Sequence, residues 1–187
     1  MAEKNQTNKT EKGKTKNKKI APVQELFPKF GEFNSVEELN EAAAGQLEEG
    51  DMESLKALAE ENGIQKEEVQ DYIDGYTDTL AMPITAAMGR ISREKEKIKT
   101  MEEQKKLPCM AILQMAEGLC VDEEFAKNVM KKGKRIEKIA DIMHREQCFM
   151  GTDKELEKII RTYYKDGEKK TKETIQEINK GYKEMWT

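Results

Sequence analysis

Three cysteines and one histidine are the residues of this 187-residue chain best suited to metal or nucleophilic chemistry. His144 and Cys148 are four residues apart, so on a helix they would share a face and could form half of a zinc site. Cys109 and Cys120 are eleven residues apart, which is not the spacing of a zinc knuckle, and their apolar neighbours indicate core packing. The sequence has no glycine-rich phosphate loop. We therefore expect a non-enzymatic protein with no catalytic residue, no metal ligand and no cofactor.

The segment 55–75, LKALAEENGIQKEEVQDYIDG, has the residue spacing of a helix–turn–helix unit. Ala59 is a small residue where the two helices would cross, and Val69 would point back into that crossing. Gly63 falls where the turn requires a positive φ, which glycine adopts readily. The spacing predicts two short helices joined by a tight turn.

The second helix of this unit is too acidic for an ordinary DNA-recognition helix. DNA affinity comes largely from Lys and Arg side chains on the phosphates, and this helix has only Lys66 among its acidic residues. An acidic helix pair is better suited to a basic protein surface, including one that normally holds nucleic acid. The predicted partner-binding residues are Glu60, Glu61, Glu67, Glu68, Asp71 and Asp74.

A basic run, KNVMKKGKRIEK at 127–138, surrounds Gly133 where one helix is expected to end and another to begin. Cations near a helix C-terminus are favourable by themselves, but a compact basic loop could also contact nucleic-acid phosphates. The nucleic-acid-binding candidates are Lys131, Lys132, Lys134 and Arg135.

The net charge of −4 is unevenly distributed along the chain. Residues 1–19 carry seven Lys and two Glu with almost no apolar side chain, which predicts a disordered basic tail that either seeks nucleic acid or only aids solubility. Residues 20–91 carry four Lys/Arg against sixteen Asp/Glu, and residues 92–187 carry twenty-two against nineteen. We expect one helical domain over 20–187, with an acidic half (20–91) and a mixed, locally basic half (92–187).

Apolar residues recur at helical spacing through this domain, and no sustained alternation indicates strands. The fold class is therefore all-α, a compact bundle of about eight or nine short helices that includes the helix–turn–helix-like unit. One longer helix should start at Pro83, with Ile84, Ala87, Met88 and Ile91 facing inward, and should stop by Leu107–Pro108. The stripe Ile84, Ile91 and Ile98 could seat a helix of this chain or of a second copy, so the oligomeric state stays open.

The aromatic segment ELFPKFGEF at 25–33 could dock on the helical body or bind a partner. No apolar run approaches the roughly 20 residues of a membrane span, and an odd number of cysteines argues against a disulfide framework. These features predict a cytoplasmic protein with reduced thiols and no membrane partner.

Five segments occur in a characteristic order: ELFPKFGEFNSVEELNEAAAGQLEEGD, LAEENGIQKEEVQDYIDG, LAMPITAAMGRI, VMKKGKRI and KIIRTYY. Together they resemble a family of small proteins from phages and conjugative elements of gram-positive gut bacteria. That family is associated with anti-CRISPR proteins, which inhibit the type II RNA-guided DNA nuclease. The resemblance covers roughly residues 25–165 and includes neither the lysine-rich N-terminus nor the last twenty residues.

The resemblance implies a stoichiometric inhibitor that binds the guide-RNA-loaded type II CRISPR effector nuclease in a bacterial host and blocks DNA binding or cleavage. Such nucleases hold a guide–target heteroduplex in a positively charged channel, where the acidic half could dock while the basic loop holds DNA or guide RNA. One alternative is a small DNA-binding or regulatory accessory protein of a phage or conjugative element, which would bind duplex DNA directly. Another is a helical adaptor that contacts no nucleic acid.

Overall fold

The computed structural model describes residues 26–148 and 152–185, and within them the chain is all-α, as the sequence predicts. The predicted disordered tail, residues 1–19, lies outside the described residues. The described part contains nine helices: α1 (Val36–Glu48), α2 (Met52–Glu61), α3 (Lys66–Ile73), α4 (Pro83–Lys99), α5 (Glu103–Leu119), α6 (Glu123–Val129), α7 (Ile136–Arg145), α8 (Asp153–Asp166) and α9 (Glu168–Met185).

Four of the described helices, α1, α2, α6 and α8, begin at a residue whose side chain caps the first turn. Asp51 and Asp122 accept backbone N–H groups in the first turns of α2 and α6. Thr152 and Glu155 form a reciprocal capping box at α8. Pro83 occupies the first turn of α4, where its missing N–H removes no helical hydrogen bond. Local sequence therefore marks where these helices begin.

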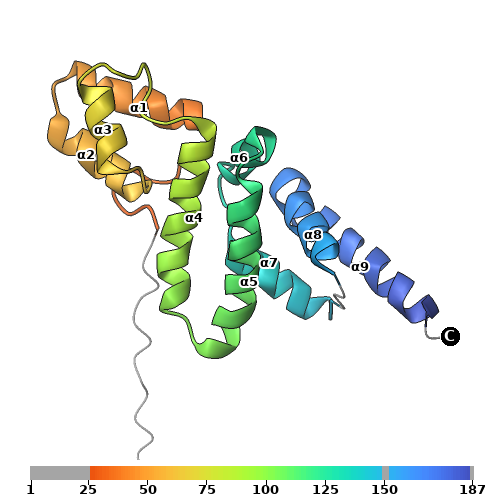
Figure 1. Ribbon diagram of the computed structural model, residues 1–187. Coiled ribbons are helices and arrows are strands. Elements are labelled where there is room, and N and C mark those ends of the chain that lie inside the picture. The colour runs from red at the N-terminus through yellow and green to blue at the C-terminus, as the bar shows by residue number, and fades with distance from the viewer. Residues whose placement is uncertain (1–25, 149–151, 186–187) are drawn as a thin grey trace, which may run out of the picture.

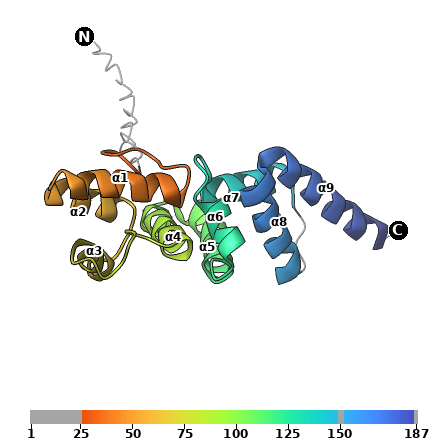
Figure 2. The same cartoon turned by 90° about the horizontal axis from the view of Figure 1, so that it is seen from above.

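Buried apolar side chains form two clusters, and α4 contributes to both. The first cluster joins α1, α2, α3 and the loop before α4, and it includes Ala86. The second joins α4 to the helices that follow it, and it includes Ala87 and Ile91. Figures 1 and 2 both show α1–α3 at one end of the molecule, α4 and α5 side by side in the middle, and α8 and α9 at the other end.

The inward face of α4 differs from the predicted stripe. Ile84 and Met88 are 40% and 41% exposed, although the hydrophobic pattern places them inside. The buried face instead includes the charged residues Arg90 and Glu94, which are 1% and 3% exposed. The spacing of apolar residues gives the wrong buried face for α4, because two positions on the true buried face hold the ionisable residues Arg90 and Glu94.

The helix break expected at Leu107–Pro108 does not occur. The chain turns at residues 100–102, and α5 begins at Glu103 and continues through Pro108. A proline inside a helix removes the hydrogen bond to the carbonyl four residues earlier, here that of Gln104. All three residues, Gln104, Leu107 and Pro108, are exposed, so water can replace the lost bond.

The aromatic segment docks on the helical body, which confirms the first of its two interpretations. Phe27 is buried, and Phe30 and Phe33 pack against the first cluster. The Glu61 carboxylate accepts the backbone N–H groups of Lys29 (2.9 Å) and Phe30 (3.0 Å). These two bonds tie the segment to the end of α2.

Candidate functional site

The helix–turn–helix unit predicted from residue spacing consists of α2, a turn and α3. Ala59 and Val69 are 1% and 5% exposed and belong to the first cluster, as the crossing of two helices requires. Gly63 has a φ of +72° at the turn. The supersecondary prediction is therefore confirmed.

A second glycine, on α4, fixes this unit against the rest of the molecule. A Cβ atom on Gly63 would lie 2.4 Å from the carbonyl oxygen of Gly89, and one on Gly89 would lie 2.4 Å from the carbonyl oxygen of Asn62. Such backbone contact is open only to glycine on both sides. The sequence pattern assigned no role to Gly89, and a glycine within a helix does not by itself reveal a close approach, since Gly45 and Gly118 also lie within helices and an added Cβ there would meet nothing within 4 Å.

The helix α3 presents an acidic face to solvent. Glu67, Asp71 and Asp74 are exposed and follow one another at helical i, i+4, i+7 spacing, so they share one face. Glu60 is exposed at the end of α2. Glu68 is half-buried and its carboxylate accepts the Gln65 N–H (3.1 Å), which caps the helix.

Glu61 is the predicted partner-binding residue that the structure places inside the fold. It is 7% exposed, and both of its carboxylate oxygens accept backbone N–H groups of the aromatic segment. A buried carboxylate engaged in this way has no oxygen facing a partner. The exposed acidic site is therefore Glu60, Glu67, Asp71 and Asp74, with Glu68 at its edge.

The basic loop is largely occupied by contacts within the fold. Arg135 forms a bidentate pair with Glu32 (2.6 and 2.8 Å), and Lys134 donates to the Tyr163 carbonyl (2.6 Å). Lys131 donates to the Lys165 carbonyl (3.4 Å), so two cations satisfy carbonyl groups near the C-terminus of α8. Burial of the Lys134 ammonium lowers its pKa.

Lys131 and Lys132 are exposed, whereas Lys134 and Arg135 are half-buried, and the backbone of Lys132 has a contact of its own. The Lys132 backbone N–H donates to the side-chain oxygen of Asn34 (3.2 Å), which holds the loop against the segment before α1. The geometry of the loop thus favours the interpretation that its cations bind carbonyl groups at the C-terminal ends of helices. It does not favour the interpretation that all four contact phosphates.

A buried arginine links this loop to both clusters. Arg90 donates to the Val129, Met130 and Lys131 carbonyls at the end of α6 (3.2, 2.6 and 3.3 Å) and to the Phe33 carbonyl (2.8 Å). Arg90 also forms an ion pair with Glu32, with 3.4 Å between Nη1 of the arginine and Oε1 of the glutamate. The sequence signal was a lone arginine in an apolar run, LAMPITAAMGRI, which the stripe pattern left without a role.

Glu32 remains ionised between these two arginines. Burial alone would raise its pKa, but the hydrogen bonds and the charge of Arg135 outweigh that effect and hold the pKa below its ordinary value. The guanidinium groups of Arg90 and Arg135 also lie over the Phe27 ring, at 5.4 and 5.6 Å from its centre. This cluster is structural because all of its members are turned toward one another.

Glu94 lies one helical turn from Arg90 on the buried face of α4. One of its oxygens accepts the Ile136 N–H (2.7 Å), the first N–H of α7. Its other oxygen has no hydrogen-bond partner among the described residues. Desolvation raises the pKa of this carboxyl to about 7, so its charge state changes near neutral pH.

The thiols and the histidine do not converge on a reactive site. Desolvation raises the pKa of Cys109 to about 11 and that of Cys120 to about 12, which keeps both thiols protonated at neutral pH. The helix α7 ends at Arg145, so Cys148 is not on the same helix face as His144, contrary to the premise of a shared site. Over the described ranges, no three His, Cys, Asp or Glu residues are grouped closely enough to hold a metal ion.

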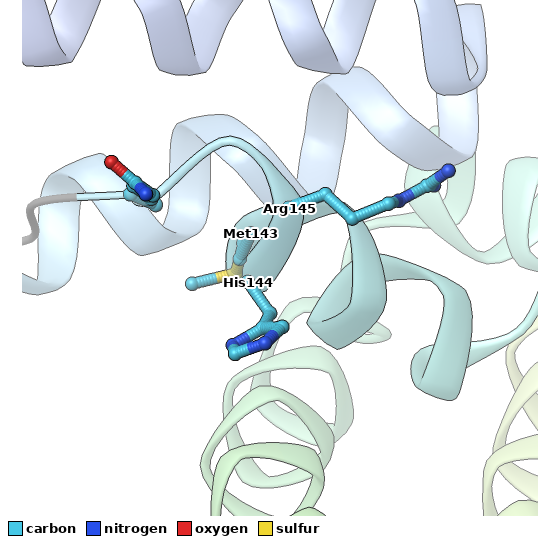
Figure 3. A pocket seen from close by; sticks show the side chains of 5 residues that line it. Met143, His144 and Arg145 are labelled. Carbon is cyan, nitrogen blue, oxygen red and sulfur yellow. The ribbon is translucent and has the colours of Figure 1, made fainter.

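A surface hollow of about 690 Å³ lies at the end of α7 and is lined by Met143, His144, Arg145, Gln147 and Cys148. Figure 3 shows the His144 and Arg145 side chains pointing in different directions. The hollow therefore lacks the convergent polar groups that a small-molecule site requires.

Comparison of the chain with family models, curated proteins and solved structures finds no match. Among the helices that the structure describes, none combines the length and the apolar composition that a membrane crossing needs.

Proposed function

We propose that this protein is a non-enzymatic inhibitor of the guide-loaded type II CRISPR effector nuclease, acting in the cytoplasm of a bacterial host. In this proposal it binds the nuclease stoichiometrically and blocks DNA binding or cleavage. The resemblance of five sequence segments to an anti-CRISPR family gives the class of partner. The acidic face of α3 gives the surface that would meet it.

The observation that carries the proposal is the exposed acidic face formed by Glu67, Asp71 and Asp74. A type II nuclease uses a positively charged channel for its heteroduplex and arginines for its short duplex motif. An acidic helix fixed by the Gly63–Gly89 contact can compete with DNA phosphates for such a surface. Lys134 and Arg135 of the basic loop already bind the Tyr163 carbonyl of α8 and the Glu32 carboxylate. Their engagement within the fold supports a protein partner over direct DNA binding.

The test is cleavage of a target plasmid by guide-loaded type II nuclease at fixed nuclease and increasing inhibitor. We expect inhibition to saturate near one inhibitor per nuclease and to be relieved by excess DNA if the DNA channel is the target. Combined reversal of three charges, Glu67→Lys, Asp71→Lys and Asp74→Lys, should raise the half-inhibitory concentration at least about tenfold, because a close charge pair is worth more than a kilocalorie per mole.

A matched variant reverses three acidic residues near the α4–α5 turn instead: Glu96→Lys, Glu102→Lys and Glu103→Lys. All three side chains are exposed, and the ion pairs of Glu96 with Lys99 and of Glu103 with Lys106 are worth little to stability. The net charge changes equally in both variants, so only a specific acidic face separates them. Failure of the wild type against several type II orthologues would refute the proposal, as would equal inhibition by both variants.

The accessory-protein alternative makes a different prediction. It requires duplex binding without nuclease and a steep loss of affinity with salt. Charge removal at Lys131 and Lys132, the two exposed cations of the loop, should then reduce the salt slope.

A further inference from the structure

The exposed large apolar side chains gather in one segment of the chain. Seven such side chains are exposed among the described residues, and four of them lie between positions 76 and 88: Tyr76, Met82, Ile84 and Met88, which we call the apolar strip. Figure 1 shows the loop that carries the first two on the outside of the α1–α3 end, leading into α4. Single exposed apolar residues are ordinary on a surface, whereas contiguous ones mark interaction sites, and these four residues of one short segment are the candidates for such a patch.

Tyr76 is displayed by the backbone geometry that ends α3. Gly75 has a φ of +76°, and the Tyr76 N–H donates to the Asp71 carbonyl (2.8 Å), as in a Schellman motif. The helix α2 ends in the same way, with Ile64 N–H donating to the Ala59 carbonyl (2.9 Å). At this motif position an apolar residue usually packs back on its helix.

The two motifs differ in the burial of the residue at this position. Ile64 is 6% exposed, whereas Tyr76 is 79% exposed. The aromatic ring is thus held out in solvent at a position where the motif would normally bury it. Tyrosine is among the residues most enriched in the energetic centres of protein interfaces.

The loop that follows Tyr76 is anchored rather than free. Asn40 on α1 clamps Ala81 by two hydrogen bonds, from its amide to the Ala81 carbonyl (2.9 Å) and from the Ala81 N–H to its oxygen (3.0 Å). Leu80 and Ala81 are buried in the first cluster. Met82 follows directly and is exposed on this anchored backbone, so binding through it costs little ordering entropy.

Met82 is also the N-cap of α4, and Ile84 and Met88 continue the strip onto that helix. They are four residues apart, so their side chains are neighbours on one helix face. The face of α4 that is turned into the core is a different one, and it includes Arg90 and Glu94.

The charged residues in the stretch that carries the apolar strip are acidic with one exception. Between residues 57 and 89 the only Lys or Arg is Lys66, while Glu67, Asp71, Asp74 and Asp78 are exposed. An apolar centre with a charged rim is the usual composition of a protein interface. The rim here is complementary to a basic partner. It would repel a second copy of the same face in a twofold dimer.

We propose that Tyr76, Met82, Ile84 and Met88 form the apolar centre of the surface on which a basic protein partner docks, with the acidic residues of α3 and Asp78 as its rim. The partner surface is expected to offer an apolar or aromatic contact for Tyr76, flanked by Lys or Arg. The identity of that partner as the nuclease rests on the proposed function.

The test measures binding of the full chain to immobilised guide-loaded nuclease. Tyr76→Ser should raise the dissociation constant at least about tenfold, as truncation of an interface centre does. Val121→Ser is the matched control, because Val121 is equally exposed (79%) but lies between α5 and α6. Circular dichroism and thermal unfolding should be the same for both variants, since both side chains project into water.

A second arm does not depend on the nuclease. A random peptide library is panned against the wild-type chain, and the enriched peptides are then measured against Tyr76→Ser and Val121→Ser. We expect peptides rich in Lys or Arg with an apolar residue, and loss of binding to Tyr76→Ser only. Enriched peptides that bind both variants equally overturn the inference.

The outcomes separate the inference from the proposed function. Wild-type binding to the nuclease with no loss in Tyr76→Ser overturns the inference and leaves the function. No wild-type binding to the nuclease overturns the function, and the peptide arm then decides the inference. A wild-type dimer in sedimentation that Tyr76→Ser converts to monomer also overturns the inference, because the strip would then be a contact between copies.

Discussion

The buried Glu94 should make the stability of this protein depend on pH near neutrality. Its carboxyl accepts the first N–H of α7 through one oxygen, while the other oxygen has no partner among the described residues. The substitution Glu94→Gln keeps an oxygen for the Ile136 N–H and removes the ionisable group. It therefore isolates the free energy of charging this site.

The sign follows from the direction of the shift. Desolvation raises the pKa of Glu94 from 4.5 to about 7 in the folded protein. The folded chain thus holds the proton more tightly than the unfolded chain, and the stabilising contribution is complete below pH 4.5. It is lost as pH rises from there through 7, and the total loss is about 3 kcal/mol at 1.36 kcal/mol per pKa unit.

The assay is urea unfolding of wild type and Glu94→Gln in buffers from about pH 4.5 to 8.5. Other titrating groups are common to both proteins, so their effects cancel in the difference. We expect Glu94→Gln to gain about 3 kcal/mol over wild type across this range, with most of the change below pH 7. A difference that stays flat with pH would refute the reasoning.

A neighbouring glutamate on the same helix serves as the control for this experiment. Glu96 is exposed, and its hydrogen bond with Lys99 lowers its pKa, the opposite direction to the shift of Glu94. Glu96→Gln should therefore show no such change with pH.

Two further predictions concern backbone conformation. Gly63→Ala should lower the free energy of unfolding by about 3 kcal/mol, because its Cβ meets the Gly89 carbonyl and its φ is positive. Gly75→Ala has a similar φ with nothing within 4 Å and should cost about 1 kcal/mol, and equal losses would contradict the close contact. Gln147 has a φ of +49°, so Gln147→Gly should raise the unfolding free energy by about 0.5–1 kcal/mol in urea titrations, and a loss would contradict relief of strain there.

The helix positions were largely predictable because their signals are local. Asp51 and Thr152 cap helices through contacts a few residues away, and these patterns can be recognised in the sequence. The continuation of α5 through Pro108 was not predictable, because its tolerance depends on which side of the helix faces water. The inward face of α4 was misjudged for a related reason: Arg90 and Glu94 are buried by partners far along the chain.

The residue types of the candidate site were predictable from the sequence, but which of its side chains are exposed to a partner was not. The exposed acids of α3 could be chosen from spacing alone. That Glu61 is buried could not, because its partners are the N–H groups of Lys29 and Phe30, about thirty residues away. The same holds for Arg135, whose partner Glu32 is 103 residues distant. Long-range pairs of this kind leave no periodic signal.

That 103-residue separation has a consequence for how the chain folds during synthesis. The aromatic segment leaves the ribosome early, but Arg135 and the α6 carbonyls that organise Arg90 follow about a hundred residues later. Phe27 must stay without its cationic partners until then, and closing so long a loop is entropically costly. The contacts of Phe27 with Arg90 and Arg135 should therefore form late in folding, after Glu61 and the α1–α3 cluster have become available to Phe30 and Phe33.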